Sequence, residues 1–283
     1  MQHINRTMKK TLIIIIILIL NSGANLFSQS TKDSLKPKMK MVKEVLYKVE
    51  NGKLKKRENL FNLNLDTYTI YDKNEKVIET GQYEIDGSLY EKTLYERNEN
   101  GDVLKAIKKN SLNETKSYWI YEYNSKKKMV SVKTFDSENK VTNIQSNEYD
   151  ENGNNIEMSL KTSENENGWK YVYKYNSDNK KIEQFRYKPD GSLKDNRKYS
   201  YDKNGNLNIE IKIDPNGSIL KFVSEYDKMN NITIQNWFNE KEEQTHQTSF
   251  EYVYDENGNW ITKKRSSNGE LSMVWEREIE YYK

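Results

Sequence analysis

The chain contains no cysteine, and its two histidines are His3 and His246. The absence of cysteine excludes disulfide bonds and a lipid-anchored cysteine behind an export signal. Zinc sites with the usual cysteine and histidine ligands, and Cys-His or Ser-His-Asp catalysis, therefore have almost no residues to draw on. We expect no metal site, no cofactor and no catalytic residues.

Apolar residues are scarce as well. Hydrophobic residues make up 34% of the 283 positions, tyrosine alone accounts for 21 of them, and charged residues make up 31%. Such a composition favours an extended array, in which each unit buries one face against its neighbours, over compact globular domains.

The N-terminal segment has the pattern of an export signal. Three basic residues precede a nine-residue apolar run, Leu12 to Leu20. Small residues then predict cleavage after Ala24 or Ser28. Nine apolar residues cannot span a bilayer, which takes about 20. We expect a signal peptide at residues 1–28, no membrane span in the mature chain, and a protein that is periplasmic, on the outer cell surface or secreted.

Without residues 1–28 the chain has no excess of either charge. That segment holds three basic residues and no acidic one, so Lys+Arg falls from 46 to 43 against 43 Asp+Glu. Nucleic-acid binding relies on a basic surface that neutralises phosphates, and we expect no nucleic-acid partner. Residues 29–43 form a polar, basic leader.

Glycine follows asparagine or aspartate at ten of its twelve positions. Asn and Asp tolerate positive φ and glycine adopts it freely, so these pairs between alternating apolar and polar runs predict tight β-hairpins. The turn glycines that repeat most plainly are Gly153, Gly205, Gly217 and Gly258.

Tyrosines precede these turns at a regular interval of about 26 residues. The repeat anchors are Tyr71, Tyr95, Tyr123, Tyr149, Tyr175, Tyr201, Tyr226 and Tyr254. A second turn lies between successive anchors, so each repeat has two strands. We predict an all-β fold: residues 44–283 form an elongated, twisted antiparallel meander of tandem hairpins. Aromatic residues at every second position, such as Trp119 and Tyr121, predict one aromatic face around which the sheet curls.

The stretch Tyr201-Asp-Lys-Asn-Gly-Asn206, followed by Asp214-Pro-Asn-Gly217, resembles the YD repeat of RHS and teneurin type proteins. The resemblance covers about residues 47–281 and is carried by the turns. It implies a strip of β-sheet that spirals, and an exported protein. The repeats here are longer than the usual unit of that family, and no separate C-terminal effector segment follows them.

Carboxylates are the remaining candidates for chemistry. Asp150, Asp202, Asp227 and Asp255 each follow an anchor tyrosine, where a short acceptor caps turn amides. Their spacing to asparagine is similar to the start of a calcium loop, but the glycine comes one place early and the bidentate glutamate is missing. Two carboxylates could also catalyse glycoside hydrolysis. We favour structural caps.

Ligand contacts are expected among aromatic residues, which combine an apolar body with a polar group. Trp119, Trp169 and Tyr171 are predicted to pack in the core. The candidate contacts with a ligand or partner are Trp237, Trp260, Trp275 and His246. Three polar segments, residues 108–116, 162–168 and 239–248, are predicted to be long loops on one edge of the sheet that form the recognition surface.

The sequence therefore favours a non-enzymatic exported repeat protein that acts as a structural or protein-interaction element at the cell envelope. Carbohydrate or cell-wall binding through tyrosine and tryptophan is the alternative, and a two-carboxylate hydrolase is a second one. The partner is a protein or a glycan. Terminal repeats leave unpaired strand edges, which predicts edge-strand self-association.

Overall fold

The computed structural model describes residues 37–56 and 66–283, so the predicted signal peptide lies outside the described residues. Residues 38–283 form one compact unit. No helix in the described ranges is long and apolar enough to cross a membrane. The strands are β1 (Met39–Glu50), β2 (Lys53–Lys56), β3 (Asp66–Tyr71), β4 (Val77–Tyr83), β5 (Leu89–Arg97), β6 (Val103–Asn110), β7 (Thr115–Tyr123), β8 (Met129–Asp136), β9 (Val141–Tyr149), β10 (Asn155–Thr162), β11 (Asn165–Tyr175), β12 (Lys181–Tyr187), β13 (Leu193–Tyr201), β14 (Leu207–Ile213), β15 (Ile219–Tyr226), β16 (Ile232–Phe238), β17 (Gln244–Tyr254), β18 (Trp260–Ser267) and β19 (Glu270–Tyr281).

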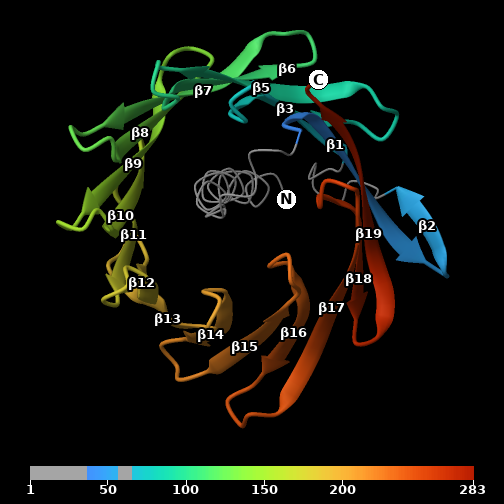
Figure 1. Cartoon of the computed structure of the whole chain (residues 1–283). Helices are drawn as coiled ribbons and strands as arrows, with labels where there is room; N and C mark the ends of the chain where they lie inside the picture. Colours follow the sequence, from blue (N-terminus) through green and yellow to red (C-terminus); the bar gives the residue numbers. More distant parts are fainter. Residues whose placement is uncertain (1–36, 57–65) are drawn as a thin grey trace, which may run out of the picture. The chain divides into compact units, whose positions relative to one another are not determined.

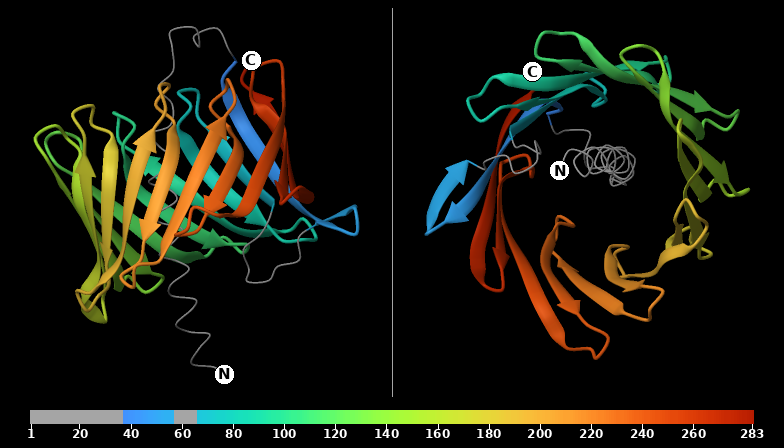
Figure 2. Two further views of the ribbon diagram at one scale, coloured as in Figure 1. Left: turned by 90° about the horizontal axis from the view of Figure 1, so that it is seen from below. Right: turned by 180° about the vertical axis from the view of Figure 1, so that it is seen from behind.

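The strands close into a barrel. From β3 to β19 each strand pairs antiparallel with the next, and β1 pairs with both β19 and β3, which gives a ring of 18 strands (Figure 1). Figure 2 shows the strands inclined side by side around the ring, with turns at its two rims. The all-β prediction is confirmed, but the open meander is wrong. The twist and coiling that were expected to curl the sheet bring its two ends together, and pairing them satisfies backbone groups that an open sheet leaves exposed.

Closure of the barrel pairs the strands at the two ends of the chain with each other. Lys43 of β1 has Glu278 of β19 as its register partner on one side and Tyr68 of β3 on the other. The first and last strands of the ring therefore offer no free edge, and self-association through β2, which has one partner strand, stays a prediction. β1 begins at Met39, inside the segment predicted as a leader, and β2 pairs with β1 alone, as a short arm beside the ring.

Most turns share one hydrogen-bond pattern. In the turn after β13, the N–H of Asp202 donates to the carbonyl of Asn206 at 2.9 Å, and the N–H of Gly205 donates to the carbonyl of Asp202 at 3.0 Å. The fourth turn residue has positive φ, as in a type I turn closed by a bulge in the left-handed region. In the turn after β13 the fourth residue is Gly205, with a φ of 89°. In other turns Asn113 (φ 65°) and Glu242 (φ 59°) stand at the fourth position and have positive φ as well.

The three predicted long loops are therefore wrong. Residues 110–113 and 239–242 form turns of this same pattern, and β10 and β11 are separated by only two residues, Ser163 and Glu164. These turns were misread because the first two lack the glycine that marks their counterparts. The recognition surface was predicted from the length of these loops, and the described residues form short turns there instead.

The aspartates after the anchors are turn caps, as predicted. The side-chain Oδ1 of Asp202 accepts the N–H groups of Asn204 and Asn206 at 2.9 and 2.8 Å. Asp150, Asp227 and Asp255 accept turn amides in the same way. A hydrogen bond from the Asn154 side chain, followed by those from turn amides, keeps the pKa of Asp150 below its ordinary value.

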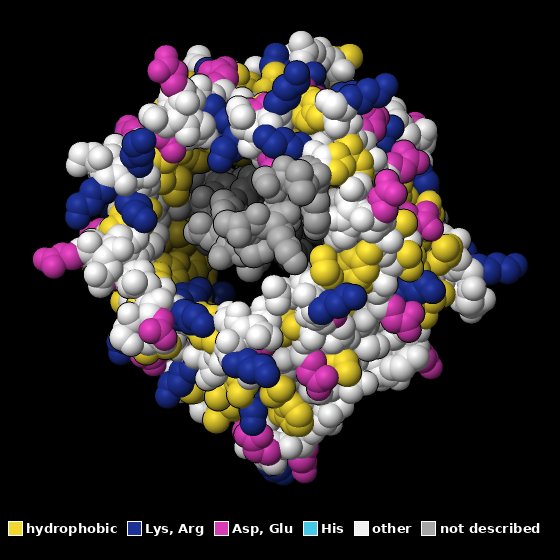
Figure 3. All heavy atoms as spheres, in the orientation of Figure 1, with side chains coloured by type: hydrophobic (Ala, Val, Ile, Leu, Met, Phe, Trp, Pro, Cys, Tyr) yellow, Lys and Arg dark blue, Asp and Glu magenta, His cyan; other side chains and the backbone are white. Residues whose placement is uncertain are grey.

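One face of the sheet holds most of the buried side chains. The register places Trp119, Thr134 and Gln145 on it, with exposed fractions of 9%, 5% and 4%. Side chains converge on the concave side of a curved sheet, so this face is the inner wall of the ring. Figure 3 shows hydrophobic side chains on part of the wall around the central opening. An 18-stranded ring is too wide for its own side chains to fill, so the inner wall borders a channel.

Tyrosine hydroxyls on this wall tie successive repeats together. Tyr201 donates to the carbonyl of Lys181, twenty residues earlier, at 2.7 Å. Equivalent bonds join Tyr123 to Val103, Tyr149 to Met129, Tyr175 to Asn155, Tyr226 to Leu207 and Tyr252 to Ile232. In the β5 repeat the predicted anchor Tyr95 is displaced by Arg97, whose Nη2 donates to the Val77 carbonyl at 2.8 Å. Arg97 ends β5, which puts it where a tyrosine ends the other strands.

Candidate functional site

The candidate ligand contacts come together on one part of the inner wall. Trp237 of β16 and His246 of β17 are register partners. Trp275 of β19 has Lys263 of β18 as its partner, and Trp260 lies at the start of β18 beside Tyr254. The side chains of all four predicted residues are half-buried. Their neighbours Phe238 and Val274 take the outer face, because side chains alternate along a strand.

His246 lies in strand β17 and not in a loop, so its predicted placement is wrong. Its ring contacts Trp237 edge-on, with centroids 5.1 Å apart. Its Nε2 is 3.2 Å from the hydroxyl of Ser267 on β18. The ring of Trp237 on β16 and the hydroxyl of Ser267 on β18 therefore hold the imidazole near one rim of the barrel.

Lys263 lies at the centre of this region. Its Nζ is 4.7 Å from the ring centroid of Phe250, 4.9 Å from that of Trp275 and 5.9 Å from that of Tyr252. Cations over aromatic faces are held by the ring quadrupole. Burial lowers the pKa of Lys263, and the charge of Glu44 opposes the shift.

Two arginines extend the basic character to both sides of Lys263. The guanidinium carbon of Arg277 is 3.4 Å from the ring centroid of Trp260, and its Nε donates to Glu44 at 2.8 Å. Arg265 has Met273 as its register partner, with Nη1 3.7 Å from the sulfur. We define the inner track as Trp237, His246, Phe250, Tyr252, Trp260, Lys263, Arg265, Trp275 and Arg277.

Charge is segregated across the wall at the inner track. The carboxylates of residues 246–254, 260–267 and 273–281 are Glu251, Glu276, Glu278 and Glu280. All of them alternate with inner-track residues and are exposed on the outer face. Within these ranges the inner face holds three cations and no carboxylate. The cations were not among the predicted contacts, although Lys263, Arg265 and Arg277 lie at the same strand parity as the aromatic residues.

A second ionic cluster lies on the inner wall of β12 to β14. Asp195 is fully buried and binds Arg186 through two hydrogen bonds, one of them 2.7 Å long, and Arg197 binds Glu210 at 2.5 Å. Burial alone would raise the pKa of Asp195, but the hydrogen bond and charge of Arg186 lower it. The Nε of Arg197 makes no hydrogen bond and lies 3.6 Å from Asp195. Because each carboxylate is paired with an arginine, we assign this cluster to the structure of the wall.

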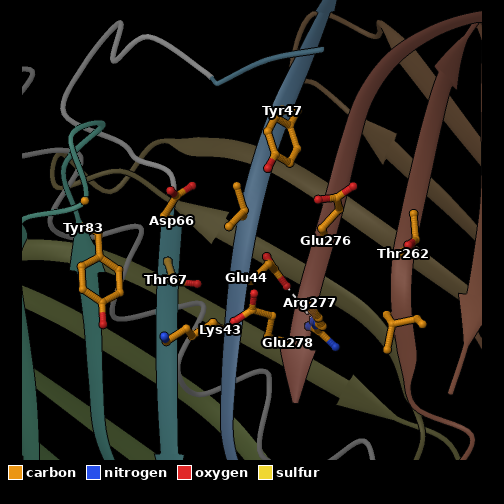
Figure 4. Close-up of a pocket in the computed structure, with 13 residues that line it drawn as sticks. Lys43, Glu44, Tyr47, Asp66, Thr67, Tyr83, Thr262, Glu276, Arg277 and Glu278 are labelled. Carbon is orange, nitrogen blue, oxygen red and sulfur yellow. Dashed lines mark hydrogen bonds and ion pairs between the residues drawn. The ribbon is translucent and has the colours of Figure 1, made fainter. Parts of the chain in front are cut away.

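A depression of about 570 Å³ lies at the seam where β1, β3 and β19 meet (Figure 4). Its lining includes Tyr47, Asp66, Glu276 and Glu278. The described ranges contain no group of three or more histidine or carboxylate side chains that could hold a metal ion.

No protein-family model and no curated protein matches this chain. Among solved structures, a porin-like protein from Bacteroides uniformis has 11% identity and a TM-score of 0.44, and the match covers 87% of this chain and 99% of that one. A porin-like protein from Bacteroides vulgatus has 11% identity, the same coverage and a TM-score of 0.33. A Tc holotoxin pore from Photorhabdus luminescens has 10% identity and a TM-score of 0.20 over 77% of this chain, which spans 20% of the toxin chain. At such low similarity, function is argued below from the chain's own residues.

Proposed function

We propose that the chain is a non-enzymatic, exported protein of the cell envelope, whose barrel is surrounded by water and binds its partner along the inner wall. The observation that carries this proposal is the ionic character of the outer face. The predicted signal peptide, and the resemblance of the turns to YD repeats, support export.

Ion pairs link neighbouring strands on the outer face. Lys133 of β8 binds Glu122 of β7 at 2.9 Å, and Lys170 of β11 binds Glu157 of β10 at 2.6 Å. A barrel in a bilayer instead carries an apolar band about 25 Å tall, and a lysine at its midplane costs about 2 to 4 kcal/mol. Glu276, Glu278 and Glu280 alternate along β19 and add to that cost.

The outer face also has an apolar area. Ile209, Ile211 and Ile213 of β14 lie opposite Ser200, Lys198 and Asn196 of β13, on the side away from the inner wall. They are half-buried. A second apolar row, Leu94, Ile107, Tyr118 and Phe135, crosses the outer face of β5 to β8. The ion pair of Lys133 with Glu122 lies on the same face of β7 and β8, so charge interrupts the apolar surface there.

The inner-wall carboxylates support a role without catalysis. A two-carboxylate hydrolase needs one carboxyl group with a raised pKa. Burial would raise the pKa of Glu91, but hydrogen bonds and charges from Lys108 and Lys116 lower it below its ordinary value. Asp195 is likewise held ionised by Arg186. Both groups favour the charged form, which is opposite to a general acid.

The proposal is tested by expressing the full chain with its N-terminal segment and separating envelope fractions. We expect the mature protein in the soluble fraction after osmotic shock or an alkaline carbonate wash, and as a detergent-free monodisperse species on purification. A protein that stays in the membrane pellet after carbonate and needs detergent to remain dispersed would contradict the proposal and indicate a lipid-embedded barrel.

Carbohydrate binding is the second candidate function. It is favoured by the position of Trp237, Trp260 and Trp275, which are half-buried on adjacent strands of one wall. The aromatic residues that we assign to the core are buried more deeply: Trp119 and Tyr171 have exposed fractions of 9% and 7%. Partly exposed indoles beside polar groups provide the surface on which sugars stack.

A further inference from the structure

We propose that the inner track is a binding site for an acidic saccharide, with sugar rings against its aromatic side chains and carboxylate or sulfate groups on Lys263 and Arg265. This inference rests on the proposed function, because it names the ligand that the inner wall of that barrel would bind.

The first step is the availability of the two cations. Arg277 has an acidic partner, Glu44, at 2.8 Å. Neither Lys263 nor Arg265 takes part in an ion pair within the described part of the chain; Lys263 contacts rings and Arg265 contacts the sulfur of Met273. Cations without an anionic partner on a half-buried wall are able to form charge-assisted hydrogen bonds with a ligand.

The second step is the sign of the charge on the inner wall. Four of the five carboxylates of β17 and β19 lie on the outer face, and the fifth, Glu270, pairs with Ser267 at the exposed start of β19. No carboxylate of these strands is therefore a register partner of Lys263 or Arg265. The nearest inner carboxylate on the adjoining strand is Glu44 of β1, and Arg277 already binds it. The inner track is therefore complementary to negative charge, although the mature chain as a whole has no net charge.

The third step concerns the kind of ligand. An acidic peptide binds a sheet most readily by adding a strand to a free edge, and β17, β18 and β19 are each paired on both sides within the closed ring. A saccharide needs no strand edge. It uses ring faces and isolated charged groups, which Trp237, Trp260 and Trp275 provide together with the cations.

The fourth step is the extent of the site. From His246 to Tyr254, β17 crosses the wall from one rim towards the other, and the aromatic and basic residues follow this course on β17, β18 and β19. At about 3.3 Å per residue the track is roughly 25 Å long. Such a length suits several sugar units of a linear chain rather than one monosaccharide.

The test uses oligogalacturonate and its methyl ester, which share a sugar backbone and differ in charge. Binding to the purified mature protein is measured by calorimetry. We expect the acid to bind at least about tenfold more tightly than the ester. Replacing both Lys263→Gln and Arg265→Gln is expected to weaken binding of the acid by about tenfold or more, with unchanged circular dichroism and Tm.

Lys264→Gln is the matched control, because Lys264 lies between the two cations in sequence but on the outer face. It should bind the acid as the parent does. Equal binding of acid and ester, an equal loss in the control, or tighter binding of polyglutamate than of oligogalacturonate would each overturn the inference. Failure of both saccharides to bind a detergent-free soluble barrel also overturns it and leaves the proposed function standing, whereas a protein that stays in the membrane after carbonate contradicts the proposed function itself.

Discussion

The hydroxyl of Tyr282 donates a hydrogen bond of 2.6 Å to the backbone carbonyl of Tyr71, 211 residues earlier in the chain. The N–H of Tyr282 also donates to the carbonyl of Lys38 at 2.8 Å. These bonds hold the C-terminal end of β19 against both β1 and β3. Closure of the barrel is thus fixed by contacts between the two ends of the chain. The other strand pairings join neighbours in sequence, apart from that of β1 with β3.

Closure predicts a disulfide between β1 and β19. Lys43 and Glu278 are register partners on the outer face. Cα atoms of antiparallel partners are about 4.5 to 5.5 Å apart, within the range that a disulfide bridges. The chain has no cysteine of its own, so the double variant Lys43→Cys with Glu278→Cys should form one intramolecular disulfide on mild oxidation, detected by thiol counting and by a mobility shift on non-reducing gels.

The matched control combines Lys43→Cys with Lys133→Cys, which lies on β8 and away from the seam. It should keep two free thiols under the same oxidation. If neither pair cross-links in the native protein, or both do so equally, the ring is not closed at this register.

The tyrosine bonds between repeats predict a small, specific loss of stability. Tyr201→Phe removes the hydrogen bond to the Lys181 carbonyl and should lower the free energy of unfolding by about 1 kcal/mol, measured from urea transitions. Tyr187→Phe on the outer face is the control and should change it by less than about 0.5 kcal/mol. If the two variants lose the same free energy of unfolding, the hydrogen bond of Tyr201 does not stabilise the barrel, and the loss comes from removing a hydroxyl group at either place.

The buried Asp195 predicts that the stability of the barrel decreases at acidic pH. Its pKa in the folded protein lies below the ordinary value, so its contribution to stability is complete above about pH 4, the unfolded value, and is lost as pH falls through the lower folded value. Asp195→Asn should lower stability at neutral pH by about 3 kcal/mol, because Arg186 loses its anionic partner. Below about pH 4 the stability of the variant should also decrease less steeply with falling pH than that of the parent protein.

Glu122→Gln is the comparison for Asp195, since its pair with Lys133 is exposed. We expect a loss below about 1 kcal/mol. Chemical denaturation from pH 2 to pH 7 measures both variants. An unchanged pH profile for Asp195→Asn would show that the ionised carboxylate does not stabilise the wall.

The inner-wall tyrosines predict alkaline unfolding. Burial raises the pKa of Tyr175 and of Tyr252 to about 12, while an unfolded tyrosine titrates near pH 10. Above about pH 10 the unfolded chain loses protons that the folded barrel retains, so stability falls between about pH 10 and pH 12. Tyrosinate absorbance followed together with circular dichroism should show the buried phenols titrating as the sheet is lost.

Tyr252→Phe removes one such group and should make the fall in stability over this range less steep. If all tyrosines ionise near pH 10 while the sheet remains folded, the phenols are open to solvent and the inner wall is not packed as described.

The hairpins could be predicted from the sequence because their cause is local. A residue with positive φ after a capping Asp or Asn defines each turn, as at Asp202 and Gly205, and alternation places Trp119 and Tyr121 on one face. Turns in which Asn113 or Glu242 takes the glycine position were missed, because neighbouring strands impose that conformation on residues that do not signal it.

The sequence singled out part of the residues of the candidate site, and their contact with a ligand stays a prediction. The three tryptophans and His246 were identified from the aromatic pattern, and they do share one wall. Lys263 and Arg265 were missed because a lysine in a strand looks like a solvated residue until the register shows which face it takes. His246 was misplaced because its polar surroundings resemble a loop.

By itself, the sequence determined a chain of antiparallel hairpins with an aromatic face, since turn geometry and side-chain alternation depend on residues a few positions apart. Only the tertiary structure decided that this ribbon closes, that Tyr282 meets Tyr71, and that the aromatic face surrounds a channel with a basic track. The physical reason is that closure depends on twist summed over 18 strands and on pairing between residues more than 200 positions apart.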